Sequence, residues 1–250
     1  MRFTAEGASL DYAVAGPRTG LPVVLIHGFP FSKEMWGPQV GPLSAEHYVI
    51  TYDVRGQGAS DRGDAQYSIE LFVDDLIALL NHLKLSRVVV CGLSMGGYIA
   101  LRAVERHPER FRGLILCDTR SEADNNEGKI RRTAQMKAVK SGSMRAFADQ
   151  YLTMVFSEQT FASRPEAVEL IRRIIEAADP LAVAGTFLAL AARTDTTAAL
   201  YTIAVPTLIL VGQHDSLTPP SAAYAMKEKI PRCSVHVIPH AAHLSTLENP

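Results

Sequence analysis

The sequence predicts an α/β protein built on a mostly parallel, twisted sheet flanked by helices. Short β-rich runs alternate along the chain with longer helical patterns, which is typical of a parallel sheet. Six of the runs are almost continuously apolar, as strands buried on both faces are. The chain has 250 residues, 47% hydrophobic and 20% charged, so it can bury a sizeable core, and we expect one folded unit.

The strands are expected in a simple order along the chain. Arg2–Ala5 and Leu10–Ala15, separated by Gly7, predict an antiparallel hairpin at one edge of the sheet. The six apolar runs follow at Val23–His27, Tyr48–Asp53, Val88–Cys91, Gly113–Asp118, Val205–Val211 and Ser234–Pro239. We expect all six to be buried on both faces.

Two helices are predicted between these strands. Apolar residues recur at helical spacing from Phe72 to Leu83, and Ser68 is the expected N-cap. The run Met95–Arg106 is rich in glycine and alanine, which let a helix approach its neighbours closely, and Pro108 closes it. We expect this second helix to be central and buried.

The segment 119–200 shows no strand pattern. Its helical stretches are broken at Ser141-Gly142, Arg164-Pro165 and Asp179-Pro180. Such an excursion between two late strands predicts an inserted helical cap. The core would then comprise residues 1–118 and 201–250, and the cap would be an insertion and not an independent domain.

Composition argues against several classes of function. The chain has 25 Lys and Arg against 26 Asp and Glu, so it offers no electrostatic footprint for nucleic acid. Its apolar runs fall far short of the ~20 residues that span a bilayer, and no signal-peptide pattern is visible, so we expect a cytoplasmic location. Three widely spaced cysteines without a Cys/His cluster predict no metal site, and we expect no cofactor.

The motif G-x-S-x-G occurs at Gly92-Leu93-Ser94-Met95-Gly96, directly after a predicted strand and directly before a predicted helix. At such a tight turn small residues are needed on both sides of the serine, whose hydroxyl is then exposed. Because a serine hydroxyl is a weak nucleophile near neutral pH, it needs a base and a third group that orients the base. The motif therefore predicts Ser94 as a nucleophile.

In the chain order that the motif predicts, the acid and then the base follow the serine. Asp215 comes just past the strand ending at Val211, and His243 follows the last strand. His214 and His240 are competing bases in neighbouring loops, and Asp118 is a competing acid at the end of another strand. We favour Asp215 and His243.

The sequence also offers candidates for an oxyanion hole and a pocket. His27-Gly28-Phe29-Pro30 follows a strand, and the backbone N–H groups of Phe29 and Met95 are the expected oxyanion donors, since Pro30 has none. Phe31, Met35 and Trp36 either wall an acyl or alcohol pocket or pack the cap against the sheet. Of these we assign Phe31 and Trp36 to the pocket.

A basic stretch from Gly128 to Ala148 contains no acidic residue. A basic cap would suit an anionic substrate such as a dicarboxylate lactone. A charge run is more often a solvated helix face, and we favour that interpretation.

Together these residues resemble the serine α/β-hydrolases over nearly the whole chain. The resemblance is carried by His27-Gly28-Phe29, by the glycine-rich turn Asp53–Ser60, by Gly92–Gly97, by Val205-Pro206-Thr207 leading to Gly212 and Asp215, and by His243-Leu244 with Leu247–Pro250. Leu116–Arg120 and Ala192–Asp195 look most like bacterial carboxylesterases and oxoadipate enol-lactonases. Haloalkane dehalogenases and epoxide hydrolases of similar fold have an aspartate where this chain has Ser94.

The chain departs from the pattern of these relatives at two places. Ala242 precedes His243 where they usually have glycine, and the sequence ends at Pro250 where they usually continue through a covering helix. The resemblance implies hydrolysis of small carboxylic esters by a Ser94–His243–Asp215 triad. The alternatives are an enol-lactonase with the same residues and, from another class, a non-catalytic ligand receptor on the same fold. In each case we expect a small-molecule ester or lactone ligand, with neither nucleic acid nor membrane as partner.

Overall fold

The computed structural model describes residues 1–250 and contains one eight-stranded sheet. The strands lie in the order β1-β2-β4-β3-β5-β6-β7-β8. Their bounds are Arg2–Ala5 (β1), Ala8–Ala15 (β2), Leu21–Ile26 (β3), His47–Tyr52 (β4), Val88–Leu93 (β5), Phe111–Cys117 (β6), Thr207–Gly212 (β7) and Cys233–Ile238 (β8). The β1–β2 and β2–β4 pairs are antiparallel, and every pair from β4 to β8 is parallel. The mostly parallel sheet and its edge hairpin are therefore confirmed.

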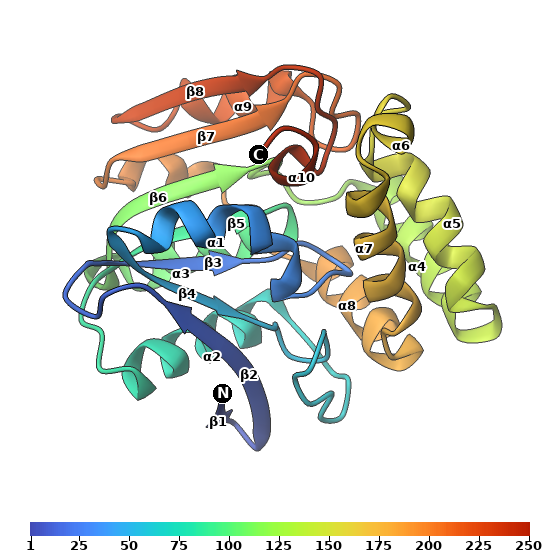
Figure 1. Ribbon diagram of the computed structural model, residues 1–250, viewed down its shortest axis with the longest axis horizontal. Helices are drawn as coiled ribbons and strands as arrows, with labels where there is room; N and C mark the ends of the chain where they lie inside the picture. Colours follow the sequence, from blue (N-terminus) through green and yellow to red (C-terminus); the bar gives the residue numbers. More distant parts are fainter.

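Helices cover both faces of the sheet, with α1 on one face and α2 and α3 on the other (Figure 1). The helices that accompany the sheet are α1 (Gly37–Ser44), α2 (Ile69–His82), α3 (Met95–Arg106), α9 (Pro220–Lys227) and α10 (Ser245–Glu248). Short 3₁₀ helices occur at Lys33–Trp36, Pro108–Arg110 and Thr197–Thr202. The predicted N-cap of α2 is present, because the Ser68 side chain accepts a hydrogen bond from Leu71 N.

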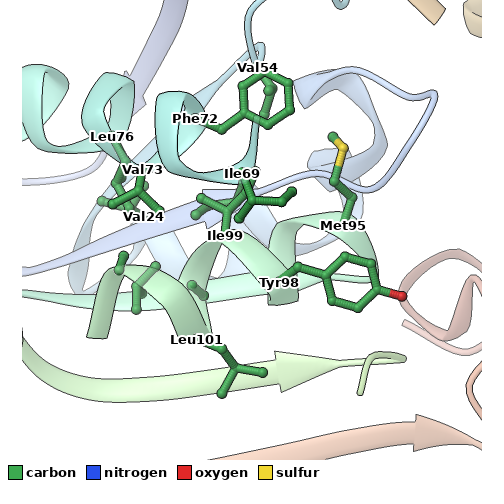
Figure 2. Close-up of a cluster of buried hydrophobic side chains, with 14 of the residues drawn as sticks. Val24, Val54, Ile69, Phe72, Val73, Leu76, Met95, Tyr98, Ile99 and Leu101 are labelled. Atoms are coloured by element: carbon green, nitrogen blue, oxygen red, sulfur yellow. The ribbon is translucent and has the colours of Figure 1, made fainter. Parts of the chain in front are cut away.

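The helix α3 is buried in the centre of the molecule. Its small residues allow a close approach: a Cβ atom on Gly97 would lie 2.4 Å from Thr119 Oγ1. Figure 2 shows side chains of α2, among them Phe72 and Leu76, in one apolar cluster with Ile99 of α3 and with Val24 of the sheet. This packing fixes the start of α3, where Ser94 is located, relative to the strands.

The strand β8 is present as predicted, but it is not buried on both faces. No residue of Cys233–Ile238 is fully buried, and the Val237 side chain is 38% exposed. The reason is its position, since β8 lies at the edge of the sheet and pairs only with β7. Ser234 and His236 interrupt its apolar pattern, as is usual for a strand with one face in water.

Five helices lie between β6 and β7, near the ends of the strands that carry the arrowheads in Figure 1. They are α4 (Asn126–Ser141), α5 (Met144–Val155), α6 (Thr160–Ser163), α7 (Pro165–Glu176) and α8 (Pro180–Ala192). Three of the four breaks between them fall at the predicted positions, and the break between α5 and α6 was not predicted. We call residues 119–200 the insertion; its description as a cap, separate from a core of 1–118 and 201–250, stays a prediction.

No single helix meets the length and apolarity needed to cross a membrane. The pair α7 and α8 does so only when taken together, and these two helices meet at 98°.

Candidate active site

Ser94 lies on a sharp turn between β5 and α3. Its backbone adopts φ 52° and ψ −112°, in a region that is strained for a residue other than glycine. A Cβ atom on Gly92 would lie 2.1 Å from Gly96 O, and one on Gly96 would lie 2.2 Å from Ile26 O. The turn therefore needs glycine on both sides of the serine, which explains the form of the motif.

The neighbouring strand β6 holds this turn. Ser94 N donates a hydrogen bond to Cys117 O at 2.9 Å, and Thr119 Oγ1 donates to Ser94 O at 2.8 Å. These bonds offset part of the cost of the strained backbone and keep the serine at one end of the sheet.

Ser94 and His243 line the same cavity, whose volume is about 530 Å³. One wall is formed by loops that follow the strands, and the other by side chains of the insertion, including Tyr151 and Phe187. Ser94 Oγ makes no hydrogen bond to His243 in this structure. Such bonds are often long in ligand-free sites and shorten only when substrate binds.

His243 is buried and is paired with Asp215. The distance from His243 Nδ1 to Asp215 Oδ2 is 2.9 Å. Asp215 is fixed in turn, because its Oδ1 accepts from Leu217 N at 2.8 Å and Thr218 N at 2.9 Å, and its Oδ2 accepts from Thr218 Oγ1 at 2.6 Å. The imidazole is thus oriented by an acid that is itself held in place.

The charges of this pair shift both pKa values. Burial alone would raise the pKa of Asp215, but the charge of His243 and the hydrogen bonds to His243 and Thr218 lower it overall. Burial alone would lower the pKa of His243, but the charge and hydrogen bond of Asp215 raise it overall. A lowered pKa for the acid and a raised pKa for the imidazole both favour the charged forms, as expected for an ion pair that forms when the imidazole is protonated.

The competing acid Asp118 is close by but makes different bonds. Its Oδ1 accepts from Gly212 N at 2.7 Å, and its Oδ2 accepts from Ser245 Oγ. Burial, together with the charge of Asp215, raises the pKa of Asp118 to about 7. Asp118 forms no hydrogen bond with His243, so the structure pairs the imidazole with Asp215.

The competing bases lie outside the cavity. His214 and His240 are both exposed, and neither is among the residues that line the space beside Ser94. Ala242, the departure from the glycine of the relatives, does not have a positive φ, whereas His240 in the same loop has φ 57°. Alanine is therefore compatible with the backbone at position 242.

The loop after β3 brings Phe29 to the cavity beside Met95. Phe29 N has no partner within the protein, and Met95 is the first residue of α3, where N–H groups lack intrahelical acceptors. His27 fixes this loop: its Nδ1 lies 2.8 Å from Gly28 O, and its Nε2 accepts from Val54 N at 2.9 Å. Burial lowers the pKa of His27, which suits a neutral ring making these two bonds.

Phe31 and Trp36, predicted as pocket residues, do not line the cavity. Both are almost fully buried in an apolar cluster that joins strands β3 and β5 to helices α5 and α7. They pack the insertion against the sheet, which is the alternative that the sequence left open. Burying these large aromatic rings between two packed layers removes more apolar surface from water than a place at a partly polar cavity would.

The basic stretch divides between the cavity and the surface. Arg131 and Arg132 line the cavity, whereas the lysines of the stretch do not. Arg132 pairs with Asp124, and Arg131 forms no ion pair. Most of the stretch is therefore an exposed helix face, as favoured, and Arg131 and Arg132 are the exceptions because they line the cavity.

Several cavity residues were not predicted from the sequence. Tyr98 is one turn after Ser94 on α3, and Arg120 is the third residue after the end of β6, so their positions in the sequence could have indicated them. Tyr151, Phe187 and Leu190 reach the cavity only through the packing of the insertion. No local sequence pattern indicates which residues of the insertion face the cavity.

Within the chain there is no group of three or more His, Cys, Asp or Glu side chains placed to hold a metal ion.

Comparison with known proteins decides the family. A family model described as the alpha/beta hydrolase fold matches residues 22–250. The chain belongs to the α/β-hydrolase superfamily. This α/β-hydrolase is 28% identical over 248 residues to 3-oxoadipate enol-lactonase 2 of Acinetobacter baylyi, covering 99% of this chain and 91% of the relative.

Solved structures of this superfamily agree with the fold. A thermophilic esterase from Thermogutta terrifontis, solved with malate bound, superposes with a TM-score of 0.95 at 39% identity, covering 100% of this chain and 94% of the esterase. The enol-lactonase from Burkholderia xenovorans gives a TM-score of 0.93 at 28% identity, covering 99% of this chain and 94% of the other. This α/β-hydrolase thus has esterases and enol-lactonases as neighbours, which indicates a hydrolase.

Proposed function

We propose that the protein hydrolyses small carboxylic esters through an acyl-enzyme intermediate on Ser94. One observation carries the proposal: Ser94 and His243 line one cavity, and His243 is hydrogen-bonded to the buried carboxylate of Asp215. A nucleophile, a base and an orienting acid are the parts that acyl transfer to a serine requires.

In the first half of the reaction Ser94 Oγ attacks the ester carbonyl while His243 Nε2 takes its proton. Asp215 holds the Nδ1–H tautomer and stabilises the imidazolium that forms. The N–H groups of Phe29 and Met95 donate to the oxyanion. The tetrahedral intermediate collapses as the imidazolium protonates the leaving alcohol, and Ser94 is left acylated.

In the second half His243 takes a proton from water, and the resulting hydroxide attacks the acyl carbon. The second tetrahedral intermediate expels Ser94 Oγ, which regains its proton from His243. The products are the alcohol and the free acid. For a lactone the alcohol and the acid remain in one molecule.

A second candidate function is hydrolysis of anionic lactones or esters, and the cationic wall of the cavity favours it. Arg120 lines the cavity, forms no ion pair and donates from Nη2 to Leu217 O at 2.6 Å. Its Nε is buried without a partner. No carboxylate of the protein pairs with this guanidinium, so a substrate carboxylate in the cavity would pair with it, and an esterase 39% identical to this chain has been solved with malate bound.

A third candidate, a ligand receptor without turnover, uses the same cavity. It differs from the others in one measurable respect, because a receptor binds its ligand and releases it unchanged.

The test is turnover by the purified protein on two panels, p-nitrophenyl esters including acetate and butyrate, and lactones with and without a carboxylate. We expect multiple turnovers on short neutral esters, abolished in Ser94→Ala. Activity confined to carboxylate-bearing lactones would favour the second candidate. Failure to turn over any member more than once would overturn the enzymatic proposal and leave the receptor.

A further inference from the structure

The loop that carries His243 is held on both sides by buried carboxylates outside the proposed triad. Ala242 N donates to Glu248 Oε1 at 2.8 Å, and Ser245 Oγ donates to Asp118 Oδ2. These two anchors bracket His243 in the chain. Asp118 belongs to the sheet, since it follows β6 and also accepts from Gly212 N at the end of β7.

Glu248 instead connects the loop to the insertion. Its Oε2 accepts from Ser157 N at 2.9 Å and from Thr160 Oγ1. A further backbone bond runs in the same place, from Leu244 N to Val155 O at 3.1 Å. The loop is therefore attached to residues 155–160, the turn between α5 and α6.

The environment of Glu248 is unusual for a charged side chain. The residue is only 8% exposed and has no cationic partner, because it forms none of the ion pairs of the structure. A buried carboxylate without a cation is costly unless hydrogen bonds satisfy it. Here three donors do so, and they come from two segments distant in sequence, Ser157 with Thr160 and Ala242.

The same turn is next to the cavity. Met154, which lines the cavity beside Ser94 and His243, immediately precedes Val155. A shift of this part of the insertion would therefore reach the base through Glu248 and Ala242 without passing through Asp215.

We propose that Glu248 is a positioning residue that couples the α5–α6 turn of the insertion to the imidazole of His243. This inference rests on the proposed function, in which His243 is the general base. Glu248 does not line the cavity, so it acts through the Ala242 peptide and not on the substrate.

The test uses Glu248→Gln, since an amide cannot accept at both of its ends. The single amide oxygen can serve either Ala242 N or Ser157 N, so one of these two backbone bonds must be lost. Displacing a base by about 1 Å can cost up to ~100-fold in rate, so we expect kcat to fall by roughly 10- to 100-fold while KM changes by less than about threefold. Thr160→Val removes one bond on the insertion side, and a smaller loss of kcat is expected.

The matched control is Asp195→Asn. Asp195 is also a carboxylate that accepts from backbone N–H groups, those of Ala123 and Thr197, but it does not line the cavity. We expect wild-type kcat for this variant. All variants are compared at equal folded fraction by circular dichroism and thermal melting.

A readout independent of turnover is ¹⁵N-histidine NMR of the His243 imidazole. In Glu248→Gln the Nδ1–H signal should shift and exchange faster with solvent than in wild type and Asp195→Asn. Unchanged kcat and an unchanged His243 signal in folded Glu248→Gln would overturn the inference. If Glu248→Gln does not fold, an unchanged kcat and signal in Thr160→Val overturn it instead. A wild-type protein that is inactive on every ester and lactone would overturn the proposed function. The NMR comparison would still show whether Glu248 positions the His243 imidazole.

Discussion

At the scale of single residues, the proposed reaction depends on the protonation state of His243. Only the neutral imidazole can take a proton from Ser94. Burial favours that neutral form, whereas the charge of Asp215 favours the protonated form and prevails, so the pKa of His243 is raised. The base is therefore inactive over a wider acidic range than an isolated histidine would be.

The pH dependence of kcat/KM follows from this direction. We expect kcat/KM to rise with pH through an apparent pKa above the ordinary histidine value of about 6.5, and then to level off. Asp118 also titrates nearby, with a pKa raised to about 7, so the rise belongs to coupled groups. Initial rates from pH 5 to 9 on one neutral ester check this. A profile already flat at pH 5 would contradict a raised pKa.

The choice of acid makes a separate prediction. Asp215→Asn should lower kcat by up to ~10⁴, because the amide favours the wrong tautomer of His243. Asp118→Asn should cost far less, since its bonds go to Gly212 and Ser245 and none goes to the imidazole. Measuring kcat for both variants decides which acid orients His243. A larger loss in Asp118→Asn than in Asp215→Asn would make Asp118 the acid.

The site could be predicted from the sequence as far as local patterns extend. Ser94 is marked by its flanking glycines, and Asp215 and His243 follow strands that end at the same side of a parallel sheet. Phe31 and Trp36 were misassigned because an aromatic residue near a site looks the same in sequence whether it faces a cavity or a packed layer. Only the packing of α5 and α7 against the sheet decides whether Phe31 and Trp36 face the cavity or a packed layer.

At the scale of elements, the turn between β5 and α3 positions Ser94, the proposed nucleophile. Its glycines are needed because backbone atoms approach them closely. They therefore serve the geometry of the turn and take no part in the proposed reaction. The strands and helices that surround it were predictable because their apolar periodicity is local. The edge strand β8 was also predicted, but its exposure was not, because the sequence alone does not say which strand ends the sheet.

A glycine exchange tests the turn. Gly92→Ala would place Cβ 2.1 Å from Gly96 O, so we expect the free energy of unfolding to fall by about 1–3 kcal/mol or more, with a large loss of kcat. Gly41→Ala in α1 is the control. A Cβ atom there meets nothing within 4 Å, and the change should be neutral or stabilising by up to ~1 kcal/mol. Urea unfolding measures both, and equal stability of the two variants would show that the turn tolerates a side chain.

At the scale of the whole molecule, the cavity exists because the insertion meets the sheet. Tyr151 of α5 makes one of the joining contacts: its Oη donates to Phe29 O at 2.9 Å, and its ring contacts Phe29 edge-on at 6.2 Å between centroids. This contact links residues 122 positions apart. Long-range packing of this kind leaves no periodic signal, which is why the insertion's helices could be predicted but its cavity residues could not.

The joining contact can be tested by Tyr151→Phe. Loss of the hydroxyl leaves Phe29 O without its donor, and we expect a loss of about 1–3 kcal/mol in unfolding free energy together with a lower kcat. Tyr201→Phe is the control, because Tyr201 is 63% exposed and its hydroxyl has no partner. If both variants unfold at the same urea concentration, the contact does not stabilise the junction.

The most direct measurement of the central claim is covalent labelling of the serine. The protein is treated with a fluorophosphonate, and the modified residue is located by mass spectrometry of peptides. If Ser94 is activated by His243 and Asp215, a single adduct forms on Ser94, and labelling is lost in His243→Ala. An unlabelled Ser94 in the folded wild-type protein, or equally fast labelling without His243, would contradict the account.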